Sequence, residues 1–127
     1  ADQNNHVEFI LIENRKHDEV IKIKRNCDII VDQIEDRGGW GYGMSSVEAM
    51  SMGLCSATEI NDCVEKVIPN HPFISINKEN CYQQLNELVN NKKLLMEKKQ
   101  SSYEWVKSYH SLDNVGLKLY ELYKQII

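Results

Sequence analysis

The residues best suited to chemistry in this sequence lie at 38–53, in the stretch GGWGYGMSSVEAMSMG. Three glycines alternate at Gly39, Gly41 and Gly43, and a segment with helical spacing that carries one acid, Glu48, follows them. Glycine lets another backbone or a ligand come close. The start of a helix offers free N–H groups and the positive end of its dipole. This stretch is therefore predicted to bind an anion, most simply a phosphate.

Two common phosphate-binding motifs do not fit the stretch. The dinucleotide fingerprint needs a third glycine three residues after the second, and counting from Gly39 and Gly41 places Met44 there. The Walker-type loop needs Gly-Lys followed by Ser or Thr, and the sequence contains no such triplet. Kinase and NAD-binding functions are therefore disfavoured.

Both the acid and the glycines also have purely structural interpretations. Ser45 and Glu48 have the spacing of a capping box, in which the glutamate side chain only satisfies the N–H of the cap residue. The glycines are also compatible with a tight turn that binds nothing. Tyr42 is expected to pack, and Trp40 either stacks on a ligand ring or packs on the sheet.

The sequence around this stretch predicts alternating strands and helices. Predicted strands cover 6–12, 27–31, 54–60 and 72–76. Predicted helices cover 19–26 and the segment from the glycines to about residue 52. From residue 77 to the end, three apolar stripes with helical spacing predict further helices, with Trp105 and Tyr109 in the core. This alternation predicts a Rossmann-like α/β fold, a parallel sheet flanked by helices. Ligands of such sheets bind beyond the carboxyl ends of the strands, which is where the glycine stretch falls.

Composition narrows the classes of protein further. A chain of 127 residues predicts one domain over 1–127, and a net charge of −4 without a basic patch argues against nucleic acid as a partner. The sequence has neither an apolar run of about 20 residues nor a signal peptide, so a cytoplasmic location is expected. The cysteines form no CxxC pair and are expected to be buried thiols, without metal or disulfides: Cys27, Cys55, Cys63 and Cys81.

The chain resembles the group 1 glycosyltransferases, retaining sugar-nucleotide enzymes with the GT-B fold. Gly41-Tyr42-Gly43 matches the glycine-aromatic-glycine part of the family signature, and Glu48-Ala49-Met50 with Gly53 matches its second half. The segments CDIIV and VKSYHSLDNVGLKLYELY are similar to the strand before the signature and to the closing helices of the family. The resemblance implies the C-terminal, nucleotide-sugar-binding part of a GT-B enzyme, without the N-terminal acceptor domain and the first strands of the donor domain.

The resemblance also implies an activity for the full enzyme. Such an enzyme transfers a hexose from a UDP- or GDP-sugar to an acceptor hydroxyl with retention, as in polysaccharide biosynthesis, and this part alone is expected to be inactive. The resemblance implies a nucleotide-sugar co-substrate and no metal or other cofactor. It further implies an acceptor held by the missing domain, no nucleic acid, and peripheral membrane association of the full protein.

Site roles carry over by position. The resemblance implies that the donor diphosphate is held at Gly41, Gly43, Met44 and Ser45. Glu48 is expected to accept hydrogen bonds from the ribose hydroxyls. Further contacts to the sugar or base are expected from Trp40, Asn14 and Arg15. The sequence does not identify a catalytic residue.

Two positions depart from the family pattern. Trp40 stands where the family has its first glutamate, which contacts the transferred sugar, and Glu35 or Asp36 is a candidate substitute. Cys55 stands where the family usually has proline. Two rival functions stay open at this point: a non-catalytic Rossmann-like module that binds a nucleotide or a partner, and a GT-B-type epimerase acting on UDP-sugars.

Overall fold

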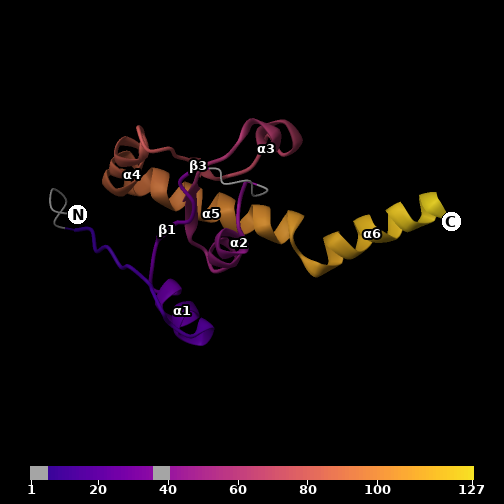
Figure 1. Ribbon diagram of the computed structural model, residues 1–127, viewed down its shortest axis with the longest axis horizontal. Coiled ribbons are helices and arrows are strands. Elements are labelled where there is room, and N and C mark those ends of the chain that lie inside the picture. The colour runs from indigo at the N-terminus through magenta and orange to yellow at the C-terminus, as the bar shows by residue number, and fades with distance from the viewer. Residues whose placement is uncertain (1–5, 36–40) are drawn as a thin grey trace.

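Three short segments form a parallel sheet at the centre of the protein (Figure 1). The computed structural model describes residues 6–35 and 41–127. In it β1 (Ile29–Val31), β2 (Cys55–Thr58) and β3 (Ile74–Ser75) lie in the order β1-β2-β3. The central β2 is buried along its whole length, and its partners are fixed by a register that pairs Ile30 with Ser56 and Ala57 with Ile74. The three later predicted strands are therefore confirmed.

Helices follow the strands and cover both faces of the sheet. Their bounds are α1 (His17–Lys24), α2 (Met44–Ser51), α3 (Asp62–Val67), α4 (Cys81–Asn90), α5 (Lys92–Tyr109) and α6 (Leu112–Ile126). Side chains alternate across a strand, so Cys55 and Ala57 of β2 join a cluster with Leu88 of α4. A second cluster joins Met50 of α2 to α3 and α5. The predicted α/β class, a parallel sheet flanked by helices, is confirmed.

The first predicted strand is wrong. Residues 6–12 form no strand, although their composition is typical of one. They begin beside α4, where His6 Nε2 lies 3.1 Å from the carbonyl oxygen of Val89, and run along the outside of the molecule towards α1 (Figure 1). Phe9 and Leu11 are exposed. Strand propensity reflects the fit of side chains to a pleated, half-buried surface, and this segment lies on no such surface.

The connection from α2 into β2 depends on Gly53. The residue has a φ of +88°, which other residues rarely adopt. The N–H of Gly53 donates to the Met50 oxygen at 3.0 Å, and the N–H of Leu54 donates to the Ala49 oxygen at 3.1 Å. These two bonds form a Schellman motif. They end α2 and turn the chain directly into the central strand.

Tyr42, the aromatic residue between Gly41 and Gly43, is part of the core. The Tyr42 ring lies 4.8 Å from the Phe73 ring and 5.8 Å from the Trp105 ring, and its hydroxyl lies 3.3 Å from His110 Nε2. The predicted packing roles of Tyr42 and Trp105 are confirmed. Tyr109 stacks on Trp105 at 5.3 Å but is 40% exposed, so it borders the core rather than filling it.

The last helix extends away from the sheet (Figure 1). None of its described residues is buried, although its stripe of apolar residues is the most regular in the sequence. The exposed members of that stripe are Leu112, Val115, Leu119, Leu122 and Ile126. Throughout the described ranges, the helices are too short or too polar to cross a membrane.

Gly41 is expected to be essential for stability. Its φ is +113°, and a Cβ there would lie 2.4 Å from Val64 Cγ2 in α3. Gly41→Ala should therefore lower the free energy of unfolding by about 2–4 kcal/mol, through strain and overpacking together. Urea unfolding measures this loss. The matched control is Gly116→Ala in α6, where a Cβ meets nothing within 4 Å. It should raise stability by up to about 1 kcal/mol, and equal effects would contradict this account.

His110 should make stability depend on pH. Burial lowers the pKa of His110, and the charge of Lys118 lowers it further. Below the unfolded-state pKa of about 6.5 the unfolded chain therefore binds more protons, so stability is lost as the pH falls through that value. Thermal unfolding at pH 7.5 and 5.5 should show a smaller decrease in Tm on lowering the pH for His110→Gln than for the wild type. An unchanged decrease in His110→Gln would contradict the assignment.

Candidate functional site

The start of α2 lies beyond the carboxyl end of β1, as predicted. Gly43 is the N-cap and has extended backbone angles (φ −95°, ψ 166°). Its carbonyl accepts from the N–H groups of Ser46 and Val47 at 3.2 and 3.4 Å, which begins the helix. Glycine has no side chain to cap the remaining N–H groups of the first turn. The positive end of α2 is thus formed by backbone alone, at the edge of the sheet where ligands of this fold class bind.

An acid that the sequence pattern did not single out, Asp32, lies beside this helix start. Asp32 Oδ2 accepts from Ser46 Oγ at 2.5 Å, and Ser46 Oγ lies 2.8 Å from Ser56 Oγ in β2. A Cβ on Gly43 would lie 3.1 Å from the same Asp32 oxygen. Asp32 therefore places a negative charge near the positive end of α2 and joins the helix to two strands. Its position directly after a predicted strand was the available sequence signal.

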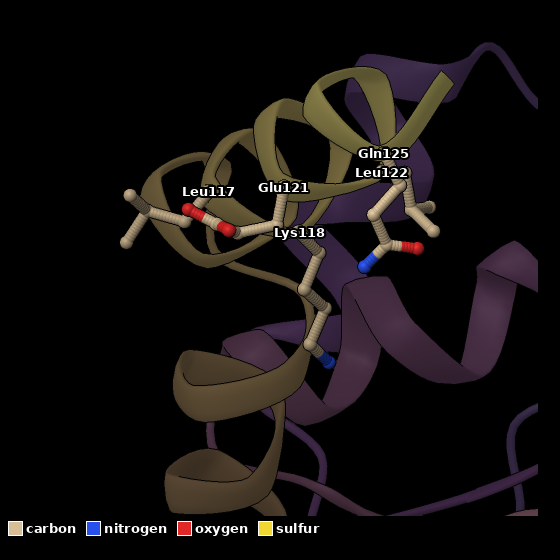
Figure 2. Close-up of a pocket in the computed structure, with 5 residues that line it drawn as sticks. All are labelled: Leu117, Lys118, Glu121, Leu122 and Gln125. Carbon is tan, nitrogen blue, oxygen red and sulfur yellow. The ribbon is translucent and has the colours of Figure 1, made fainter. Parts of the chain in front are cut away.

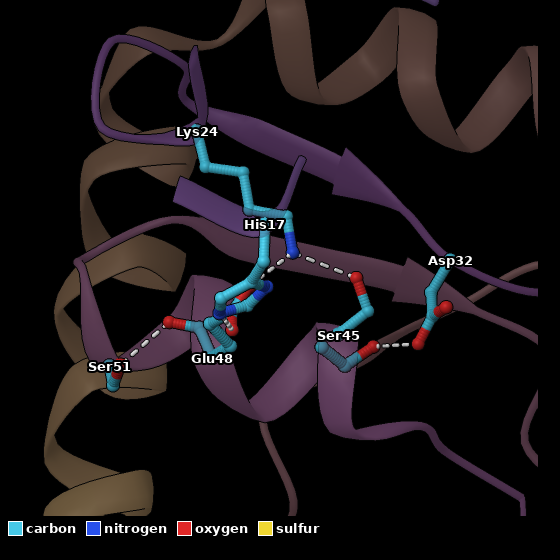
Figure 3. Close-up of polar contacts among 7 residues, drawn as sticks. His17, Lys24, Asp32, Ser45, Glu48 and Ser51 are labelled. Carbon is cyan, nitrogen blue, oxygen red and sulfur yellow. Dashed lines mark hydrogen bonds and ion pairs between the residues drawn. The ribbon is translucent and has the colours of Figure 1, made fainter. Parts of the chain in front are cut away.

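A second group of polar side chains lies on another face of α2 (Figure 3). Lys24 Nζ donates to Glu48 Oε1 at 2.7 Å and to Ser45 Oγ at 2.9 Å. His17 Nε2 lies 3.3 Å from the other carboxylate oxygen, Oε2. Residues three apart share a helix face, which brings Ser45 and Glu48 together. Both His17 and Lys24 belong to α1, so this helix is fixed to α2 through Glu48.

The capping-box interpretation of Glu48 is wrong. The N-cap is Gly43 rather than Ser45, so Glu48 is not the third residue of the helix. Its carboxylate is directed to Lys24 and His17 instead, and the Ser45 hydroxyl accepts from Lys24. The Glu48 side chain is 28% exposed, which leaves part of the carboxylate open to solvent.

The other predicted contact residues differ in their surroundings. Asn14, with a φ of +53°, and the exposed Arg15 immediately precede α1. Because His17 touches Glu48, this loop lies next to the residue that is predicted to bind the ribose. Gly41 is buried and packs against α3, so the structure gives it a packing role. Its contact with a diphosphate, like those of Met44 and Ser45, stays a prediction.

The two departures from the family pattern have separate outcomes. Trp40 and Asp36 lie outside the described residues. Glu35, the other candidate substitute, is ion-paired with Lys78. Cys55 donates its backbone N–H to the Asp28 oxygen at 3.0 Å, a bond that proline cannot make. Cysteine at this position thus adds a hydrogen bond between β2 and the residue before β1.

The cysteines carry no assembled site. All four are free thiols; the expected burial is confirmed for Cys55, Cys27 and Cys81 are only partly buried, and the expectation is wrong for the exposed Cys63. Burial raises the pKa of the Cys55 thiol to about 12, which makes it unreactive at neutral pH. Within residues 6–35 and 41–127, no three His, Cys, Asp or Glu side chains are grouped to hold a metal ion.

A shallow groove elsewhere on the protein is formed by a single helix, α6. Figure 2 shows side chains of α6 that line it, among them Lys118, Glu121 and Leu122. All of its lining residues come from this one exposed helix. The α2 region, where several elements converge, is therefore the better candidate site.

Comparison of the chain with protein-family models, curated proteins and solved structures found no match in any of the three.

The Lys24–Glu48 pair should respond asymmetrically to substitution. The Lys24 side chain is 8% exposed and that of Glu48 is 28% exposed. Glu48→Ala leaves a buried ammonium without its carboxylate and should cost about 2–3 kcal/mol of unfolding free energy. Lys24→Met leaves a carboxylate that water and His17 can still reach, and should cost about 1 kcal/mol.

Urea unfolding of both variants measures the asymmetry. Lys22→Met, on the exposed side of α1, is the matched control and should change stability by less than about 0.5 kcal/mol. A loss in Lys24→Met equal to or larger than that in Glu48→Ala would contradict the role assigned to the burial of Lys24.

Proposed function

We propose that this chain binds a nucleoside-diphosphate sugar at α2 and is the donor-binding part of a retaining glycosyltransferase of the GT-B fold. The observation that carries the proposal is the set of contacts and the exposure of the Glu48 carboxylate. Its carboxylate is paired with a buried cation, stays partly open to solvent, and lies on the second turn of a helix whose start has no side-chain cap. A carboxylate held in this way is a suitable acceptor for the hydroxyl groups of a ribose.

The charges around α2 suggest where the diphosphate binds. Lys24 lies on the face of α2 that carries Ser45 and Glu48, whereas Asp32 lies on the face of Ser46. A diphosphate at the backbone N–H groups of Gly43, Met44 and Ser45 is repelled by Asp32 on the second face, whereas the charges of Lys24 and Glu48 on the first face largely offset each other. We therefore assign it to the Lys24 side of the helix start.

The same placement gives the base a location. His17 touches Glu48 and directly follows the loop with Asn14 and Arg15. A nucleotide with its ribose at Glu48 and its diphosphate at the start of α2 therefore has this loop within reach of its base. The proposal thus uses two segments far apart in sequence that Glu48 and His17 bring into contact.

In the full enzyme the helix start would act on the departing diphosphate. Transfer of the hexose from UDP or GDP to an acceptor hydroxyl leaves negative charge on the diphosphate, and oriented N–H groups stabilise that charge as it develops. The acceptor would be held by another part of the protein. We assign no metal to this step.

Glu48→Gln tests the proposal. Neutral glutamine keeps the size of the side chain but weakens hydrogen bonds from hydroxyl donors, so the Kd for UDP or GDP should rise about 10-fold. An NMR amide titration measures the Kd and should show shifts at Gly43–Glu48 and Asn14–His17, with one base preferred. Glu87→Gln, on an exposed face of α4, is the control and should bind like the wild type. Equal affinities for Glu48→Gln and the wild type would contradict the ribose role.

A non-catalytic module that binds a partner protein is the second candidate. The observation in its favour is the exposed apolar stripe of α6. Turnover of UDP- and GDP-hexoses by the longest available form of the protein separates the two functions, with Trp40→Glu assayed in parallel. Transfer by the wild type supports the enzyme; turnover by neither form supports the module.

A further inference from the structure

Lys24 is the one charged residue among the buried side chains that the structure describes. Its ammonium directs two hydrogen bonds at α2, one to Glu48 and one to Ser45. Burying a lysine costs side-chain entropy and solvation, whereas an exposed ion pair keeps most of its solvation. In return, the carboxylate of Glu48 is held in one orientation by a group that solvent barely reaches.

The second carboxylate oxygen has a different kind of partner. His17 Nε2 is 3.3 Å from Oε2, and the His17 side chain is 76% exposed. An exposed side chain can rotate away at little cost, because few contacts hold it. Glu48 therefore has one permanent contact on its buried side and one displaceable contact on its solvent side (Figure 3).

A carboxylate that is fixed by Lys24 on one side and can be freed from His17 on the other suits the binding of a ribose. A vicinal diol donates two hydrogen bonds, and both oxygens of a single fixed carboxylate can accept them. If the carboxylate were free to rotate, its ordering on binding would weaken the interaction. A site built to accept from a hydroxyl also rejects ligands that lack it.

We propose, on the basis of the function proposed above, that Lys24 is a positioning residue that fixes the Glu48 carboxylate for the ribose diol, and that His17 occupies the place of a ribose hydroxyl until a nucleotide binds. The site then selects ribonucleotides over deoxyribonucleotides. Lys24 makes no contact with the ribose itself and acts only through Glu48.

The test compares UDP and GDP with their 2′-deoxy counterparts by NMR titration of the chain. The wild type should bind the preferred ribonucleotide about 10-fold more tightly than its deoxy form, the effect of one hydrogen bond to a charged group. Lys24→Met should reduce this ratio to about 2-fold or less, because the carboxylate is no longer fixed. Lys22→Met is the matched control on the same helix and should keep the wild-type ratio.

His17→Ala supplies a second, independent readout. If His17 only occupies the place of a hydroxyl, its removal should leave the affinity for the ribonucleotide unchanged or raise it by a few-fold. A 10-fold loss of affinity in His17→Ala would overturn that part of the proposal, since it would make His17 a direct ligand.

The outcomes separate this inference from the proposed function. A wild-type ratio near 10 that persists in Lys24→Met overturns the role of Lys24 and leaves nucleotide binding intact. Absence of binding by the wild type to either nucleotide at millimolar concentration overturns both.

Where Lys24→Met does not fold, Glu48→Gln is compared with Glu48→Gln/Lys24→Met, which leaves no buried ammonium. Equal affinities of these two variants support action through Glu48, and a further loss in the double variant overturns it.

Discussion

The close packing of α2 on the central strand is the constraint on which the rest of this structure depends. Ser46 and Ala49 of α2 are fully buried, and the Ser46 hydroxyl bridges Asp32 and Ser56. Small side chains let a helix approach a sheet closely, and a buried hydroxyl needs partners once it has lost water. This network therefore fixes both the distance of α2 from the sheet and its rotation.

The rotation of α2 decides which charges meet. With Ser46 directed at the strands, Ser45 and Glu48 are directed at α1, where Lys24 and His17 contact them. The acid beside the helix start and the cation beside its second turn thus lie on different faces. Glu48 offsets the charge of Lys24, so the Asp32 carboxylate disfavours an anionic ligand on its own face of α2 and leaves the Lys24 side for its approach.

The glycine stretch combines a packed segment with the start of α2 in one loop. Gly41 lets the loop pack against Val64 of α3, and Tyr42 anchors it among Phe73 and Trp105. Gly43 then starts α2 with bare backbone. The part of the loop that stabilises the fold therefore directly precedes the part available to a ligand, and the first makes the position of the second rigid.

The sequence by itself determined the parallel α/β architecture, the helix start after the glycines and the core positions of Tyr42 and Trp105, because these follow from local periodicity and backbone preference. It did not predict that residues 6–12 lie outside the sheet, since a strand depends on an available neighbour. Only the tertiary structure decided the partners of Glu48. Lys24 is 24 residues away from Glu48, and the other partner, His17, also belongs to α1. Which side chains meet across elements depends on how close and at what rotation the helices pack, and local sequence does not contain that information.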